Sequence, residues 1–225
     1  MKENRRKFHN DIECVQNGFA NGSALDRPLT DEEKDQMIKE AAIHFGNFLT
    51  ALKCDWQNDP NSADTPTRVA KAYVKDLWAG RYNGFTDITS FPSDGYQGII
   101  LEKDIPLISQ CSHHHQTIQG VVHIAYIPGV EGRVIGLSKL NRIVDHFGRR
   151  GAIQEQLTIA IHQAVNKVCE GNIGVMVMIK ATHNCVSCRG IKHQGASMMT
   201  SEVSGVFADH NNTSKIEVLE MIKMS

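Results

Sequence analysis

The run that most constrains the fold is residues 120–127, where every second side chain points to the same side of an extended chain. The even-numbered residues from Val122 to Tyr126 would lie on one face of a strand, and the residues between them on the other. Shorter apolar runs flank this strand at residues 99–101, 105–108 and 175–179. Short neighbouring strands of this kind predict an antiparallel sheet.

Around these strands, apolar residues that recur at intervals of three and four predict helices. Thr30 opens a capping box before a helix that extends to about Leu52. Thr65 is expected to cap a second helix, with Pro66 at its first position. The other expected elements are a helix over residues 139–149 capped by Ser138, a long helix at 153–170, a strand at 198–206 and a last helix at 215–224.

These elements predict an α+β fold, in which helices pack on one face of an antiparallel sheet and a helical segment precedes the sheet. Residues 1–29 are polar and lack sustained periodicity, so we expect them to form an N-terminal arm. Residues 30–90 then make up the N-terminal helical segment, and residues 91–225 make up the α+β domain.

The composition argues against several classes of partner. With 225 residues and 41% hydrophobic side chains, the chain can bury a sizeable core, and a formal net charge of −1 gives no electrostatic reason to bind nucleic acid or an anionic membrane. No apolar run approaches the roughly 18 residues that a membrane span needs, and the first residues do not resemble a secretory signal. We therefore expect a cytoplasmic protein whose six cysteines are thiols.

A run of potential metal ligands, Cys-Ser-His-His-His at residues 111–115, follows one of the predicted strands. Zinc accepts both Cys sulfur and His nitrogen, and Cys111 and His114 can close on one ion if the chain turns between them. In a regular strand Cys111 would share a face with His113 instead, so the spacing leaves the choice of imidazole open. A second cluster, Thr-His-Asn-Cys at residues 182–185, offers another thiol beside another imidazole.

The number of ligands separates two classes of function. Three protein ligands leave zinc an open position for water, as in catalytic sites, whereas four ligands close it, as in structural sites. Cys185 and Cys188 are spaced so that both can join Cys111 and His114 in a closed site. If these residues bind zinc and are not ordinary surface or core side chains, the chain is either a zinc enzyme or a zinc-stabilised binding or scaffold protein.

Several segments occur together in the order found in one enzyme family. They are TPTRVAK at residues 65–71, CSHH at 111–114, GVVHIAYIP at 120–128, VIGLSKLNR at 134–142, IQEQLT at 153–158, ATHNC at 181–185 with Arg189-Gly190, and GVF at 205–207. From about residue 30 to the C-terminus, the chain resembles GTP cyclohydrolase I. It departs from the family pattern at Ser112, where an acidic residue is usual, and at His115 and Cys188, where apolar residues are more common.

The resemblance implies a tunnelling-type fold and an enzyme that converts GTP and water into 7,8-dihydroneopterin triphosphate and formate, the first step of pterin and folate biosynthesis. It implies Zn²⁺ as cofactor, GTP as substrate, and a homo-oligomer, a toroidal decamer with shared active sites. Matched position by position, the family pattern assigns metal binding to Cys111, His114 and Cys185, and catalysis to His113 and His183. The substrate-binding residues that it implies are Glu155 for guanine, with Gln154 supporting the purine pocket, and Arg68, Lys139, Arg142 and Arg189 for the triphosphate, with Ser138 beside them.

The residue types suit this chemistry. Opening the imidazole ring of guanine requires water to attack C8, and a zinc ion with three protein ligands lowers the pKa of water from about 15.7 toward 7. A His side chain, with a pKa of about 6.5, can protonate the departing ring nitrogen. A carboxylate at Glu155 can accept hydrogen bonds from guanine, and adenine would leave that acceptor unpaired. An enzyme of the same fold with another metal or another product is the alternative within this class.

Overall fold

The computed structural model of the protein describes residues 6–8, 27–85 and 88–224. Most of the expected N-terminal arm, residues 1–29, therefore lies outside the described residues. The chain divides into two compact units, a smaller one over Ser23–Gly84 and a larger one that joins Met1–Gly22 to Phe85–Ser225. Within the described part of the chain, no helix is both long enough and apolar enough to cross a membrane.

The smaller unit begins with the expected long helix, α1 (Asp31–Ala51). Its capping box is present as predicted, because the backbone N–H of Glu33 donates to Thr30 Oγ1 at 3.2 Å and the backbone N–H of Thr30 donates to the Glu33 carboxylate at 2.8 Å. The buried side chain of Ile38 packs with residues of the following helices in a small core of its own. The N-terminal helical segment is thus held by local capping and by this core.

The second expected helix is divided. It starts as α2 (Thr65–Ala72), continues through a π-helical turn (Tyr73–Leu77) and ends as α3 (Ala79–Tyr82). Asp64, not Thr65, is the residue that precedes the first turn, so the prediction of Thr65 as the cap was one residue late. Pro66 occupies the second helical position, where its missing N–H is not needed within the helix.

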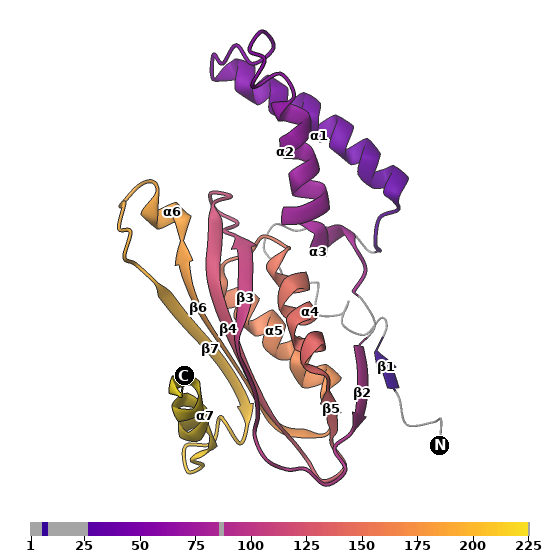
Figure 1. Ribbon diagram of the computed structural model, residues 1–225, viewed down its shortest axis with the longest axis vertical. Coiled ribbons are helices and arrows are strands. Elements are labelled where there is room, and N and C mark those ends of the chain that lie inside the picture. Colours follow the sequence, from indigo (N-terminus) through magenta and orange to yellow (C-terminus); the bar gives the residue numbers. More distant parts are fainter. Residues whose placement is uncertain (1–5, 9–26, 86–87, 225) are drawn as a thin grey trace. The chain divides into compact units, whose positions relative to one another are not determined.

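The larger unit is organised by a four-stranded sheet (Figure 1). Its strands are arranged in the order β3-β4-β6-β7, and each pairing is antiparallel, as the sequence predicted. The strands are β3 (Ile100–Gln110), β4 (Thr117–Pro128), β6 (Asn172–His183) and β7 (Met198–Gly205). The two runs expected at residues 99–101 and 105–108 form one strand, β3, with a shift of register near Asp104, which has a positive φ of 59°.

A second, three-stranded sheet was not predicted. It has the order β1-β2-β5 and is built from β1 (Arg6–Phe8), β2 (Ile88–Pro92) and β5 (Arg133–Ile135), again in antiparallel pairs. Strands of three to five residues carry too little alternation to stand out in a sequence. Their pairing depends on partners far away along the chain.

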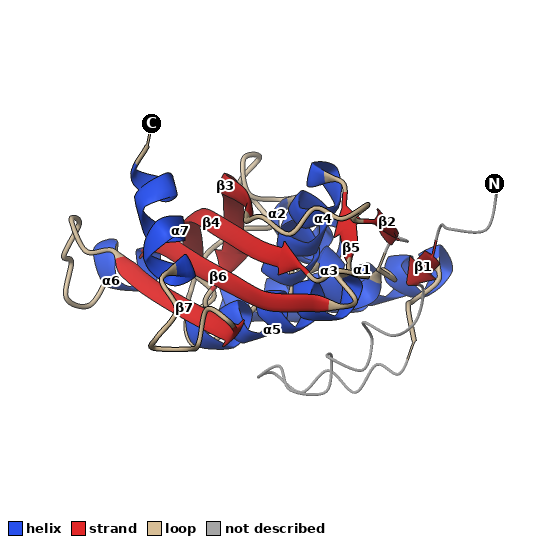
Figure 2. Ribbon diagram, turned by 90° about the horizontal axis from the view of Figure 1, so that it is seen from below, coloured by secondary structure: helices blue, strands red, loops and turns tan. Residues whose placement is uncertain are grey.

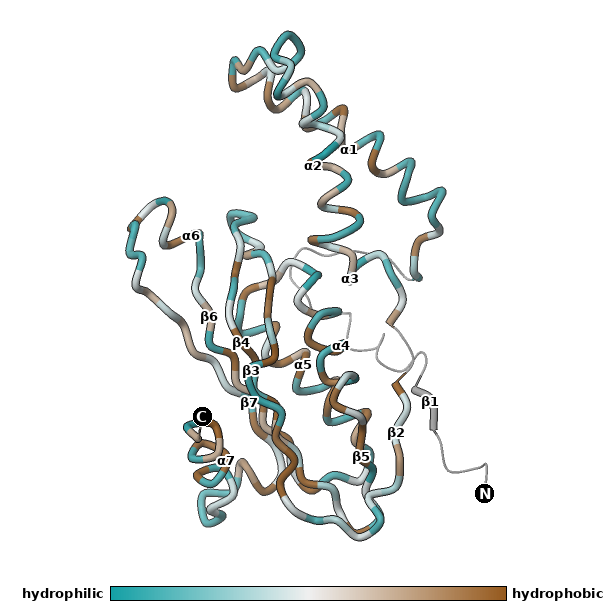
Figure 3. Tube along the Cα trace, in the orientation of Figure 1, coloured by the Kyte–Doolittle hydropathy of each residue, from teal (hydrophilic) through white to brown (hydrophobic). Residues whose placement is uncertain are grey.

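Helices cover both faces of the four-stranded sheet (Figure 2). On one face α4 (Leu137–Gly148) and α5 (Gln154–Val168) pack against the even-numbered residues of β4, as expected. On the other face the short helix α7 (Ser214–Lys223) adds a second, smaller core around Val218. Hydrophobic residues are accordingly concentrated along the strands and along α4 (Figure 3).

The start of α4 also corrects an expectation. The helix begins at Leu137 with Gly136 as its N-cap, and no side chain caps it. Ser138, which was predicted to cap this helix, is therefore its second residue and exposes its hydroxyl-bearing side chain to solvent.

Candidate metal centre and active site

The segment between β3 and β4 folds back sharply on itself. The backbone N–H of Cys111 donates to the carbonyl of Gln116 at 2.8 Å, and that of His115 donates to the carbonyl of Cys111 at 2.9 Å. His115 takes the left-handed conformation, with φ of 54°. The chain thus turns between Cys111 and His114, which is the condition under which these two side chains can bind one ion.

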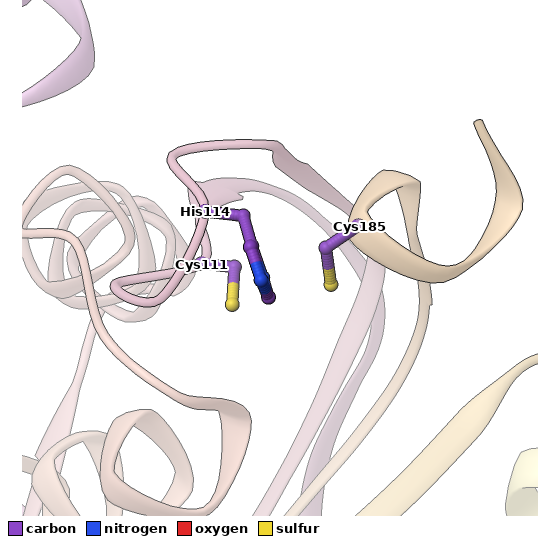
Figure 4. A group of neighbouring side chains, drawn as sticks. All are labelled: Cys111, His114 and Cys185. Atoms are coloured by element: carbon purple, nitrogen blue, oxygen red, sulfur yellow. The ribbon is translucent and has the colours of Figure 1, made fainter. Parts of the chain in front are cut away.

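The second cluster reaches the same place through strand pairing. Ile118 of β4 lies opposite His183 at the end of β6, so the short helix α6 (Asn184–Ser187) begins beside the Cys111 turn. Cys185 lies in that helix. Figure 4 shows the two sulfurs and the His114 ring directed toward a common space, and the ligand atoms of Cys111, His114 and Cys185 all lie within 4.8 Å of one another.

The donor set and its spacing fit zinc. Atoms bound to one zinc ion, at about 2.3 Å for sulfur and about 2.1 Å for nitrogen, lie within roughly 4.6 Å of one another, so little movement would let the three atoms share an ion. Burial raises the pKa of the Cys185 thiol, the adjacent Cys111 raises it further, and Arg189 acts in the opposite direction. A bound cation would reverse this, because a thiol that coordinates a metal loses its proton.

Cys188 does not belong to this group of ligand atoms. Its Sγ contacts the carbonyl oxygen of Asn184 at 2.7 Å and lies 3.5 Å from Gln116 Oε1. The group found among the described residues has three members, which leaves a metal ion an open position. This arrangement favours the catalytic alternative over the closed structural site.

Three further expected residues lie near these ligand atoms: His183, Glu155 and His113. His183 is half-buried, and burial lowers the pKa of its imidazole while the nearby carboxylate of Glu155 acts in the opposite direction. Glu155 itself is exposed in the first turn of α5, where it is available to a ligand. His113 is exposed next to His114, with the two ring centroids 6.4 Å apart.

Gln154 lies behind His183. Its side chain is fully buried, and its Oε1 lies 2.8 Å from Nε2 of His183. The amide nitrogen faces strands β6 and β7, where it is 3.0 Å from Thr200 Oγ1. Thr200 in turn contacts Thr158 at 2.7 Å. Sequence reasoning did not identify these two threonines; the only local signal was the four-residue spacing of Gln154 and Thr158 on one helix.

Three of the substrate-binding residues that the resemblance implies lie elsewhere in the larger unit. Asn141 donates a hydrogen bond to Glu102 near the start of β3, whereas the end of α4 lies beside the end of β3, where Ala152 donates to Gln110 at 3.0 Å. Eight residues of strand at about 3.3 Å each separate Glu102 from Gln110, a distance of roughly 25 Å. The start of α4, which carries Ser138, Lys139 and Arg142, therefore lies at the end of the sheet opposite the Cys111 turn (Figure 1).

Arg189 and Arg68 differ in their surroundings. Arg189 is exposed and close enough to influence the pKa of Cys185, so the structure brings it to the metal cluster. Arg68 belongs to the smaller unit, where its guanidinium pairs with Asp64 at 3.2 Å on the surface of α2.

Comparison with known proteins agrees with this geometry. A model of the GTP cyclohydrolase I family matches residues 31–223. Among curated relatives named GTP cyclohydrolase 1, that of Mycolicibacterium gilvum (strain PYR-GCK) is 39% identical over 195 residues, which cover 86% of this chain and 94% of the relative. That of Mycolicibacterium paratuberculosis is 39% identical over 208 residues, covering 90% and 97%. The protein of Mycobacterium tuberculosis (strain ATCC 25177 / H37Ra) is 40% identical over 190 residues, covering 84% and 91%. The chain belongs to the GTP cyclohydrolase I family.

Proposed function

We propose that the protein is a zinc-dependent GTP cyclohydrolase that opens the imidazole ring of guanine at C8 and forms 7,8-dihydroneopterin triphosphate and formate. The observation that carries the proposal is the three-membered group of Cys111, His114 and Cys185, with His183 beside it. Membership of the family supplies the reaction and the substrate. In this proposal the product is the starting compound for pterins and folate. The enzyme acts in the cytoplasm.

In this proposal Cys111, His114 and Cys185 hold a zinc ion. When bound, zinc supplies a Lewis acid that makes water nucleophilic near neutral pH. Two thiols and one imidazole favour zinc over calcium or magnesium, because those two ions bind mainly to oxygen ligands.

The chain's own acids and bases serve the purine. His183 donates a proton to the departing ring nitrogen, and the Glu155 carboxylate nearby favours the protonated imidazole that can do so. His113, exposed at the turn, is placed to exchange protons on another side of the substrate. Glu155 accepts hydrogen bonds from the guanine N–H groups and so distinguishes guanine from adenine.

The triphosphate requires a second subunit. Within one chain, the proposed metal ligands lie roughly 25 Å from the start of α4, which carries Lys139 and Arg142. This distance is greater than the reach of one nucleoside triphosphate from C8 to its last phosphate. We propose that a neighbouring chain contributes the start of its α4, with Ser138, Lys139 and Arg142, to each site. Arg189 joins them from the chain that holds the metal, and Arg68 is the remaining cation assigned to the triphosphate. A homodecamer with shared sites meets this requirement.

The proposal is tested by loading purified protein with zinc and following GTP, formate and pterin fluorescence together. Equal amounts of formate and 7,8-dihydroneopterin triphosphate are the expected result. Release of formate without ring closure would indicate a family member that stops at another product. Incubation with ATP is the matched control, and no product is expected from it.

A further inference from the structure

The hydrogen bonds around Gln154 determine where each proton lies. Thr158 Oγ1 is 2.8 Å from the backbone carbonyl of Gln154, one helical turn earlier. A carbonyl oxygen can only accept, so the single hydroxyl hydrogen of Thr158 is donated there. The contact of 2.7 Å between Thr158 and Thr200 must then be donated by Thr200. Thr200 Oγ1 keeps both of its lone pairs, and one of them accepts from Gln154 Nε2.

The same logic fixes the orientation of the Gln154 amide. Its Nε2 lies 3.3 Å from the carbonyl of Ile179, 3.2 Å from the carbonyl of Met198 and 3.0 Å from Thr200 Oγ1. An oxygen in that place would face two carbonyl oxygens without a hydrogen between them, so only the NH₂ group fits. Oε1 is therefore the amide atom that faces His183.

The orientation of the Gln154 amide determines which nitrogen of the His183 ring carries hydrogen. Oε1 has no hydrogen, and it lies 2.8 Å from Nε2 of His183, so Nε2 must carry the hydrogen of this bond. In the neutral ring the other nitrogen, Nδ1, then has none. Two backbone carbonyls and two threonine hydroxyls thus select one tautomer and one ring orientation for His183.

We infer that Gln154 is a positioning residue for His183: it holds the ring and keeps hydrogen on Nε2, so that protons are exchanged with substrate through Nδ1. The inference rests on the function proposed above for His183. Gln154 was expected to support the purine pocket, and its amide groups are already used within the chain and fully buried. Its support for the purine therefore acts through His183 and not through a direct contact.

The tautomer can be measured directly on the zinc-loaded protein. Magic-angle-spinning NMR of sedimented protein labelled with ¹⁵N-histidine, at mildly alkaline pH, distinguishes protonated from unprotonated ring nitrogens, and His183→Ala identifies the signals of His183. Hydrogen on Nε2 and none on Nδ1 is the expected result. Hydrogen on Nδ1 would overturn the inference whether or not the protein acts on GTP.

Kinetics test the positioning role. Gln154→Met removes the acceptor at nearly constant size, and kcat for GTP is expected to fall about tenfold to a hundredfold, as for other residues that orient a functional imidazole, with KM and zinc content little changed. The control is Gln163→Met, an exposed site on the same helix, which should leave both constants unchanged. A raised KM with an unchanged kcat would show a direct contact with guanine and contradict the inference.

A second variant guards against loss of folding. Thr200→Val is close in shape and leaves the amide of Gln154 in place, but it removes the hydroxyl that the amide donates to. We expect a smaller loss of kcat in the same direction and a mixture of His183 tautomers in the NMR spectrum. The role assigned to the hydrogen bonds of Gln154 would be overturned by two results together. One is a Thr200→Val variant with a single Nε2–H tautomer and an unchanged kcat, and the other is an unchanged kcat in Gln154→Met. Absence of GTP turnover in the wild type would instead count against the proposed function alone.

Discussion

At the scale of single residues, surroundings decide what each histidine can do. His183 lies near the carboxylate of Glu155, which partly offsets the effect of burial on the pKa of the imidazole. For His146, burial and, to a smaller extent, the Arg150 guanidinium lower the pKa to about 3. The first residue is suited to proton transfer, whereas the second is a neutral part of the core.

His183→Ala should separate catalysis from metal binding. The imidazole lies outside the group of three ligand atoms, so we expect the variant to retain its zinc and to lose turnover of GTP by about 10²- to 10⁴-fold. Zinc content by atomic absorption and kcat by pterin fluorescence check this, with the exposed His210→Ala as control. Loss of zinc from the His183 variant would show that this residue is a ligand.

His146 should make the protein sensitive to acid. In the unfolded chain His146 takes up a proton below a pH of about 6.5, whereas in the folded chain it does so only near pH 3. The free energy of unfolding is therefore at its full value above pH 6.5 and decreases as the pH falls toward 3. His146→Gln keeps an acceptor for Arg150, which lies 3.4 Å from the ring, but does not titrate. In urea unfolding at pH 4 to 6, the wild type should lose about 1.4 kcal/mol per pH unit more than this variant. The same pH dependence of the free energy of unfolding in the wild type and in His146→Gln would contradict the expectation. His210→Gln is the control.

At the scale of secondary structure, the pairing of β4 with β6 builds the site, because it brings the Cys111 turn beside α6. Gly120 permits this pairing: a Cβ there would overlap the carbonyl oxygen of Lys180 and lie 2.5 Å from Cα of Ala181. The strands at both ends of this pairing were predicted from the sequence, whereas the turn at Cys111 was a condition that the spacing left open.

Gly120→Ala should therefore disrupt the sheet. The new methyl group meets backbone atoms that cannot move away independently, so we expect a loss of about 3 kcal/mol or more in the free energy of unfolding, with loss of zinc. Gly195→Ala is the control, because the nearest atom to its Cβ is a flexible side chain at 3.8 Å, and a change within about 0.5 kcal/mol is expected. Equal stability of the two variants would show that β4 and β6 can separate at this point without cost.

Features that depend on distant partners could not be predicted in the same way. The short strands β2 and β5 gain their stability from each other across more than forty residues, and no local pattern marks them. The start of α4 was misplaced because Ser138 is a good capping residue in isolation, whereas the chain leaves β5 so that Gly136 takes that position. Likewise, the role of Thr200 behind Gln154 became visible only when β7 was seen beside α5.

At the scale of the whole molecule, the residues assigned to metal and to triphosphate lie at two separate places in the larger unit of one chain. The metal cluster with His183, Glu155 and Arg189 lies at one end of the four-stranded sheet, and the start of α4 lies at the other. The family pattern assigned these residues to metal binding, catalysis or substrate binding, but a sequence does not state which chain supplies each of them. The separation along β3 is the physical reason for proposing that two chains complete each site.

Mixed assemblies should recover activity. Cys185→Ser, which lacks a proposed metal ligand, and Arg142→Ala, which lacks a proposed phosphate ligand, are each expected to be nearly inactive. If the two residues of one site come from different chains, random mixing of both variants gives about a quarter of the sites both intact residues, and roughly that fraction of wild-type activity should return. Co-expression followed by a GTP assay checks this. Activity no greater than the sum of the separate variants would show that each chain completes its own site.

The most direct test of the account is to measure, on one purified sample, the zinc content per chain and the products formed from GTP. We predict about one zinc ion per chain, and formate and 7,8-dihydroneopterin triphosphate in equal amounts. Cys188→Ser should match the wild type in both measurements, because Cys188 lies outside the ligand group. A fully zinc-loaded protein that leaves GTP intact, or that releases its zinc when Cys188 is replaced, would contradict the account.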